Sequence, residues 1–236
     1  MGAHALRDRV FRANLALADS GLVLETFGNV SGADHDAGLM AIKPSGVPYQ
    51  KLTLVDIVLV SIESGLAVDG ALRPSSDTPA HLELYRAFRC GGIVHTHSKF
   101  ATAFAQAQTP IRCLGTTHAD YFRGDVPVTR PMTGPEVAGD YERNTGLVIV
   151  ETVRALGFSP AEVGAALVAS HGPFVWSDDP MHAVEAARML EYLAEVNLAA
   201  RLVNPAEPAP ARFLVDRHYL RKHGAQAYYG QRPPAS

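Results

Sequence analysis

Stretches with apolar residues at helical spacing alternate along the chain with short apolar runs that are typical of buried strands. The helical spacing, together with capping signals such as the Thr133–Glu136 box, predicts helices over 4–20, 81–88, 99–107, 133–155 and 180–203. The apolar runs predict strands over 22–26, 40–42, 57–62, 92–97 and 165–170. Helices and strands interleave, which predicts an α/β domain whose sheet is covered by helices. The order and direction of the strands do not follow from this pattern.

The polar segments between these elements do not divide the chain into separate domains. Turn-forming residues occupy 27–31 and 74–77, and a proline-rich break over 204–210 precedes a polar, aromatic tail at 211–230. None of these segments resembles an interdomain linker, so we expect one domain over 1–236. Aromatic and histidine side chains are uncommon in frayed termini, so we expect the tail to pack on the core or on a neighbouring subunit.

Composition removes several classes of function. The 236 residues include 21 Lys and Arg against 24 Asp and Glu, a net charge of −3, so there is no global basic field for nucleic acid. No apolar run approaches the ~20 residues that cross a bilayer, and the first residues lack the apolar centre of a signal peptide. Two cysteines, Cys90 and Cys113, are too few for a disulfide framework, which favours a cytoplasmic protein.

Histidines follow two of the predicted strands. His95 and His97 end the strand at 92–97, where residues two apart point to the same face, and His171 with Gly172 follows the strand at 165–170. Three imidazoles and one open position are the ligand set of a catalytic zinc. The alternative is a pair of strand ends that carry polar residues without a metal.

Short polar turns lie near the predicted strand ends and contain hydroxyl, amide and lysine donors. Together they could cradle a phosphate, although each alone is more simply an ordinary turn. Asp77, directly after the last of these turns, is either a fourth metal ligand, a base beside the metal, or the N-cap of the next helix. The residues of these turns are Gly28, Asn29, Lys43, Ser45, Gly46, Ser75 and Ser76.

An aromatic loop at 118–122 contains Asp120 beside Tyr121 and Phe122. Burial against these rings would raise the pKa of the Asp120 carboxyl and suit it to proton transfer. The alternative is a salt bridge within the loop.

These motifs together resemble the class II (zinc) sugar-phosphate aldolase/epimerase family over nearly the whole chain, and the loop around Asp120 and the tail around Tyr229 favour its epimerases over its aldolases. The matching stretches are 28–31, 42–46, 74–79, 91–98, 115–122, 170–174, 218–225 and 229–231. The resemblance implies a three-layer α/β/α sandwich around a largely antiparallel sheet. It also implies a homotetramer in which the tail, about 211–236, packs at a subunit interface.

The same resemblance implies roles for individual residues. Zn²⁺, with Mn²⁺ or Co²⁺ as substitutes, would be held by His95, His97 and His171, with Asp77 at or next to the metal. The seven turn residues would line the substrate and phosphate pocket. Asp120 and Tyr229 would be the acid/base pair, with His218 nearby and Tyr229 contributed by the adjacent subunit.

The implied reaction interconverts L-ribulose 5-phosphate and D-xylulose 5-phosphate. Because C4 carries no acidic hydrogen, inversion requires cleavage of the C3–C4 bond, rotation of the aldehyde and its re-addition. Two alternatives remain: an aldolase that releases the aldehyde, and a metal-stabilised binding protein without turnover. A zinc hydrolase is disfavoured because the chain has no His-Glu-x-x-His motif.

Overall fold

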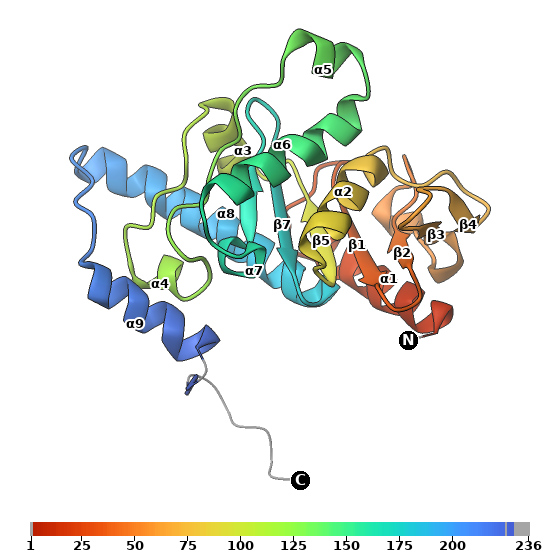
Figure 1. Cartoon of the computed structure of the whole chain (residues 1–236), viewed down its shortest axis with the longest axis horizontal. Coiled ribbons are helices and arrows are strands. Elements are labelled where there is room, and N and C mark those ends of the chain that lie inside the picture. The colour runs from red at the N-terminus through yellow and green to blue at the C-terminus, as the bar shows by residue number, and fades with distance from the viewer. Residues whose placement is uncertain (1, 225, 229–236) are drawn as a thin grey trace.

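The computed structural model describes residues 2–224 and 226–228, and its centre is a seven-stranded sheet (Figure 1). The strand order is β4-β3-β2-β1-β5-β7-β6, and every neighbouring pair of strands is antiparallel. The strands are β1 (Asn29–Asp34), β2 (Leu39–Ile42), β3 (Val58–Ser61), β4 (Ala67–Asp69), β5 (Gly92–His95), β6 (Ala165–Leu167) and β7 (Pro173–Ser177).

Helices cover both faces of this sheet. One face packs against α1 (Ala3–Asp19), α3 (Lys99–Gln106) and α8 (Pro180–Val203), and the other against α2 (Thr78–Phe88) and α6 (Tyr141–Ala155). The strands serve both cores by alternation, since Ile93 packs with α2 and α6 whereas Val94 packs with α3 and α8. Figure 1 shows α2 and α6 in front of the sheet and α8 behind it. The predicted three-layer α/β/α sandwich with an antiparallel sheet is therefore confirmed.

Four further helices complete the described fold. They are α4 (Thr116–Ala119), α5 (Gly134–Ala138), α7 (Pro160–Val163) and α9 (Arg212–His223), with 3₁₀ turns at Tyr49–Lys51 and Leu54–Asp56. The tail thus forms a helix, and α9 lies against α4 (Figure 1). Within the described ranges, none of the helices combines the length and the apolar character that a membrane span requires.

Most predicted helices are confirmed, because periodicity and caps are local signals. The predicted helix over 133–155 is wrong in one respect, since it is two helices: α5 ends at Ala138, and α6 begins at Tyr141. The Thr133–Glu136 capping box starts α5 as predicted. Gly139, with φ −92° and ψ −126°, leaves the helical conformation and separates the two.

The predicted strand over 22–26 is wrong, and the neighbouring segment predicted as a turn, 27–31, contains the first residues of β1. Glu25 adopts a left-handed φ of 56°, which ends any extended run there. β1 consists of small and polar residues, so it lacks the apolar pattern of a strand, although it is buried throughout. Asn14 of α1 compensates, because its amide donates to the Val30 carbonyl and accepts from the Val30 N–H.

Two predicted strands are shorter than expected, and both corrections concern the histidines. β5 ends at His95, so His97 lies beyond the strand, and β6 ends at Leu167, so His171 lies in the turn that leads into β7. In that turn Ser170 has a left-handed φ of 61°, and the His171 N–H donates to the Val168 carbonyl. The histidines are therefore grouped by loop geometry rather than by strand alternation.

Candidate active site

Three imidazoles meet at one end of β5 and β7. The ring centroids of His95 lie 5.0 Å from His97 and 4.9 Å from His171, and those of His97 and His171 lie 5.0 Å apart. One ring nitrogen from each residue falls within 4.8 Å of the other two. The structure thus groups the three histidines that the sequence singled out, in an arrangement that suits a metal ion.

The backbone fixes which nitrogen of His95 faces this cluster. Its Nδ1 lies 3.0 Å from the carbonyl oxygen of Pro173, and a carbonyl only accepts, so Nδ1 carries the hydrogen and donates. The Nε2 lone pair remains for a ligand. Phe174 stacks on the same ring at 4.2 Å and holds its plane. A metal-binding histidine commonly has such a second hydrogen bond, which sets its tautomer.

The other two imidazoles are held neutral. Burial lowers the pKa of His171 to about 4, with further lowering by His95 and His97. Burial and the neighbouring His95 also lower the pKa of His97. Neutral imidazoles have a lone pair to offer, so the chemistry of these donors fits a divalent cation at neutral pH.

Asp77 is adjacent to this cluster, and its carboxylate is not used as a helix cap. It occupies the N-cap position of α2 without a capping side-chain bond, and instead accepts a hydrogen bond from the amide of Asn29 at 2.6 Å. Burial alone would raise the pKa of Asp77, but His95, His81 and Asn29 hold it below its ordinary value. The carboxylate is therefore charged and available beside the histidines.

Two of the polar turns are joined to each other. The backbone N–H of Ser45 donates to the backbone carbonyl of Arg73, and the N–H of Ser75 donates to the backbone carbonyl of Lys43, each at 3.0 Å. The turns line one cavity of about 380 Å³ together with the histidines and Asp77. All seven turn residues that the sequence analysis assigned to substrate and phosphate line it: Gly28, Asn29, Lys43, Ser45, Gly46, Ser75 and Ser76.

Gly28 is required where it stands. Its φ is +88°, and a Cβ there would come within 3.0 Å of the His95 carbonyl oxygen and 3.1 Å of Val23. The absence of a side chain lets the chain before β1 pass close to the histidine strand.

Lys43 is a buried cation. It is 2 % exposed, its Nζ lies 4.6 Å from the Tyr49 ring centroid, and burial lowers its pKa. No carboxylate forms an ion pair with it among the described residues. An ammonium without an anionic partner is costly to bury, so its position at the cavity wall indicates a site for an anion.

The residues near this cavity that the sequence analysis did not assign to the site include three with ionisable side chains. Tyr141 and Glu142 line it from the start of α6, and the Tyr141 hydroxyl lies 3.5 Å from Nδ1 of His171. His81 is fully buried behind Asp77 and bonds to Ser31 at 2.6 Å. No local signal in the sequence marks them, since each is an ordinary helical residue. Only the packing of α2 and α6 on the sheet brings them near the cavity.

Asp120 lies elsewhere, at the end of α4, and does not line the histidine cavity. Its carboxylate accepts hydrogen bonds from Arg221 and His218 of α9. The expectation of a raised pKa is wrong: burial does raise the pKa of Asp120, but Arg221 and His218 outweigh it and hold the pKa low. Of the alternatives, the salt bridge is the one that forms, although its partner is on α9 rather than in the loop. Tyr229 lies outside the described residues.

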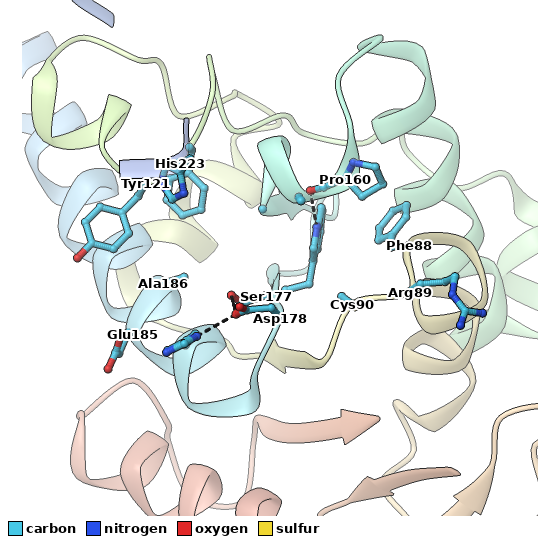
Figure 2. A pocket seen from close by; sticks show the side chains of 15 residues that line it. Phe88, Arg89, Cys90, Tyr121, Pro160, Ser177, Asp178, Glu185, Ala186 and His223 are labelled. Carbon is cyan, nitrogen blue, oxygen red and sulfur yellow. Dashed lines mark hydrogen bonds and ion pairs between the residues drawn. The ribbon is translucent and has the colours of Figure 1, made fainter. Parts of the chain in front are cut away.

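A second and larger cavity, about 510 Å³, lies at the other end of β5 and β7 (Figure 2). Its walls include Phe88 and Trp176, whose rings lie 4.9 Å apart, and the pair formed by His182 and Asp178. None of the three clustered histidines lines it. The smaller cavity is therefore the candidate active site.

Comparison with known proteins identifies the family to which this chain belongs. Residues 8–198 match the family described as "Class II Aldolase and Adducin N-terminal domain", and the chain belongs to that family. A solved L-fuculose 1-phosphate aldolase is 23% identical with a TM-score of 0.77, covering 93% of this chain and 99% of its own.

Two further solved structures are similar over most of their length. The YgbL protein of Klebsiella pneumoniae is 25% identical with a TM-score of 0.70, covering 92% of this chain and 99% of its own. The L-fuculose-1-phosphate aldolase of Thermus thermophilus is 26% identical with a TM-score of 0.67, covering 87% of this chain and 100% of its own.

Proposed function

We propose that this protein is a zinc-dependent L-ribulose-5-phosphate 4-epimerase that interconverts L-ribulose 5-phosphate and D-xylulose 5-phosphate. The observation that carries the metal and sugar-phosphate part is the content of one cavity: three imidazoles with accessible nitrogens and a buried lysine that no described carboxylate neutralises. The L-fuculose-1-phosphate aldolases among the similar structures act, by their names, on a sugar phosphate, which agrees with this content.

The turns supply the phosphate site in this proposal. Lys43 provides the positive charge, and Ser45, Gly46, Ser75 and Ser76 provide hydroxyl and backbone donors around it. Holding the phosphate matters twice, since the same contacts retain the aldehyde fragment after the C3–C4 bond is broken. An epimerase needs that retention, because the fragment must rotate and be attacked again.

His95, His97 and His171 would hold the metal, with Asp77 at or beside it. A divalent cation there would stabilise, by about several kcal/mol, the negative charge that develops on the C2 oxygen as the enediolate forms during cleavage. The chain's own contribution is orientation: Pro173 and Phe174 fix the His95 ring, and Asn29 fixes the Asp77 carboxylate.

Proton transfer to and from the C4 oxygen is assigned to the cluster at α4 and α9, with Asp120 and His218, and to Tyr229. These groups would serve opposite faces of the aldehyde. Since Asp120 does not line the histidine cavity of its own chain, we assign it to the cavity of a neighbouring subunit in a homotetramer. The loop around Asp120 favours the epimerase over the aldolase, because the resemblance makes this loop, with the tail around Tyr229, particular to the epimerases.

The second candidate is an aldolase that releases glycolaldehyde phosphate, favoured by the names of two similar structures. An NMR time course of the zinc-loaded protein with L-ribulose 5-phosphate separates the two. The epimerase accumulates D-xylulose 5-phosphate without free glycolaldehyde phosphate, whereas the aldolase releases the aldehyde. No conversion by the zinc-loaded protein would reject both and leave a binding protein.

A further inference from the structure

A compact set of charged hydrogen bonds joins α4 to α9. Arg221 donates from Nε to Oδ1 of Asp120 at 2.8 Å and from Nη2 to Oδ2 at 2.5 Å. His218 places Nδ1 3.2 Å from Oδ1, and His223 donates to the Asp120 backbone carbonyl at 2.9 Å. One face of α9 therefore holds both the carboxylate and the backbone of Asp120.

The Asp120 carboxylate has little capacity left for a proton. A carboxylate offers about four lone-pair positions, and Arg221 and His218 together use three. The guanidinium takes one oxygen with each arm of its fork, which is the strongest geometry for this pair. Its lowered pKa agrees, since an efficient general base has a pKa near the working pH.

His218 is placed differently. Because a carboxylate only accepts, Nδ1 of His218 carries the hydrogen and donates to Asp120, and Nε2 keeps the lone pair. The side chain is 19 % exposed, compared with 12 % for Asp120. A carboxylate that orients an imidazole in this way also stabilises the imidazolium that forms when the ring takes up a proton.

We propose that His218 is the proton-carrying residue of this cluster, and that Asp120 and Arg221 are positioning residues that act through it. This inference rests on the proposed function. As the C3–C4 bond breaks, its electron pair becomes the C2=C3 double bond of an enediolate, and the carbonyl pair of C2 moves onto the C2 oxygen. The C4 hydroxyl proton passes to Nε2 of His218, and the O–H electron pair forms the C4=O bond of the aldehyde. When the bond re-forms on the other face of the aldehyde, the new C4 oxygen receives a proton from the group on that side. Exchange with solvent then resets both groups.

Other charged groups surround the pair and must be kept constant in any titration. Lys222 lies over the Tyr121 ring at 4.0 Å, and Arg123, which follows α4, pairs with Glu162 of α7. His223 stacks on Tyr219 at 4.6 Å. None of these contacts involves the Asp120 carboxylate.

The first test reads protonation in the intact protein, without turnover. In the wild type, ¹³C NMR should show the Asp120 carboxylate ionised throughout the pH range of activity, and ¹⁵N NMR should show the neutral His218 ring with its hydrogen on Nδ1. Arg221→Met should raise the pKa of Asp120, Arg221→Lys should raise it less, and the exposed Arg217→Met should leave it unchanged. An Asp120 carboxylate that titrates in the range of activity overturns the proposal.

The second test reads kcat in single and double variants. His218→Gln should lower kcat at least about 100-fold, the usual contribution of a general acid or base. Asp120→Asn should also lower kcat, because the imidazolium loses its anionic partner, but it should add little further loss when combined with His218→Gln, since it acts through that ring. Imidazole should restore activity to His218→Gly. A large further loss in the double variant, or near-normal kcat in His218→Gln, overturns the assignment and leaves the epimerase proposal standing. A wild type without epimerase activity rejects the epimerase instead, and the NMR result then stands alone.

Discussion

The histidine cavity and the cluster between α4 and α9 both join residues far apart in the chain, yet they are built in opposite ways. In the cavity, the ring nitrogens of His95, His97 and His171 converge without bonding to one another. In the cluster, Arg221 and His218 occupy three of the about four lone-pair positions of the Asp120 carboxylate. The first region leaves its lone pairs free for a ligand, whereas the second uses most of its lone pairs in hydrogen bonds within the protein.

This difference separates a site that receives a ligand from one that positions a group. Buried polar groups are normally paired, so the lone pair of the buried His95 and a Lys43 charge that no described carboxylate neutralises indicate a ligand from outside. The partly buried His171 and the exposed His97 supply two further lone pairs for it. The Asp120 carboxylate, which accepts hydrogen bonds from Arg221 and His218, instead holds α9 on α4. The two regions meet on one substrate only if subunits associate.

The largest expected effect comes from removing one of the open donors. His97→Ala should abolish stoichiometric zinc binding and lower kcat/KM by more than about 100-fold, since loss of a ligand exceeds the usual 10–100-fold cost of losing a ligand's supporting contact. Metal content by mass spectrometry and circular dichroism check the result. The exposed His182→Ala, in the other cavity, is the matched control. Full zinc and turnover in His97→Ala would remove the metal assignment.

Mixing subunits tests whether the two regions serve one site across an interface. Oligomers formed from His97→Ala and Asp120→Asn chains should recover activity in about a quarter of their sites, those that combine an intact cavity with an intact neighbour. His97→Ala mixed with Lys43→Met should recover nothing, because both lesions fall in the cavity of a single chain. Native mass spectrometry must first show that the chains exchanged. Equal recovery in both mixtures would contradict the separation of the two regions.

Lys43→Met tests the open charge in the cavity. We expect KM for the sugar phosphate to rise roughly tenfold or more, because a charged hydrogen bond is worth about 1.5–3 kcal/mol. The ligand-free protein should be as stable or more stable, since the substitution removes a buried ammonium that lacks a carboxylate partner in the described part of the chain. Calorimetry and steady-state kinetics give the two readings. The exposed Lys51→Met should change neither, and a large loss of stability in Lys43→Met would indicate a structural role.

Removal of the Asp120 charge from the cluster between α4 and α9 should have a smaller effect, on the stability of the protein and its pH dependence. The folded protein lowers the pKa of Asp120, so the carboxylate stabilises the fold above its unfolded pKa, about 3.9, and that contribution is lost as pH falls through the lower folded value. Asp120→Asn should lower Tm by roughly 3–10 °C at neutral pH.

The difference in Tm between wild type and Asp120→Asn should shrink as the pH falls below about 4. Asp216→Asn is the control on the same helix, because its contact with Arg212 is 3.7 Å long and exposed. A Tm difference that is constant with pH would contradict the charge argument.

Local signals in the sequence determined the helices and the identity of the candidate ligands. Apolar spacing and caps defined α1, α3 and α8 within about a residue, because each helix satisfies its own backbone. The histidine, serine and lysine motifs named many of the residues that line the cavity, because their chemistry is visible in single residue types.

Tertiary structure alone decided the rest. β1 is a central strand because Asn14 and the flanking strands β2 and β5 satisfy its polar groups. The sequence of β1 alone does not indicate these partners. His171 faces His95 because the turn between β6 and β7 folds back, and Asp120 has a low pKa because α9 returns some 100 residues later to bind it. These features depend on contacts between distant segments, whose free energy exists only once the layers have packed.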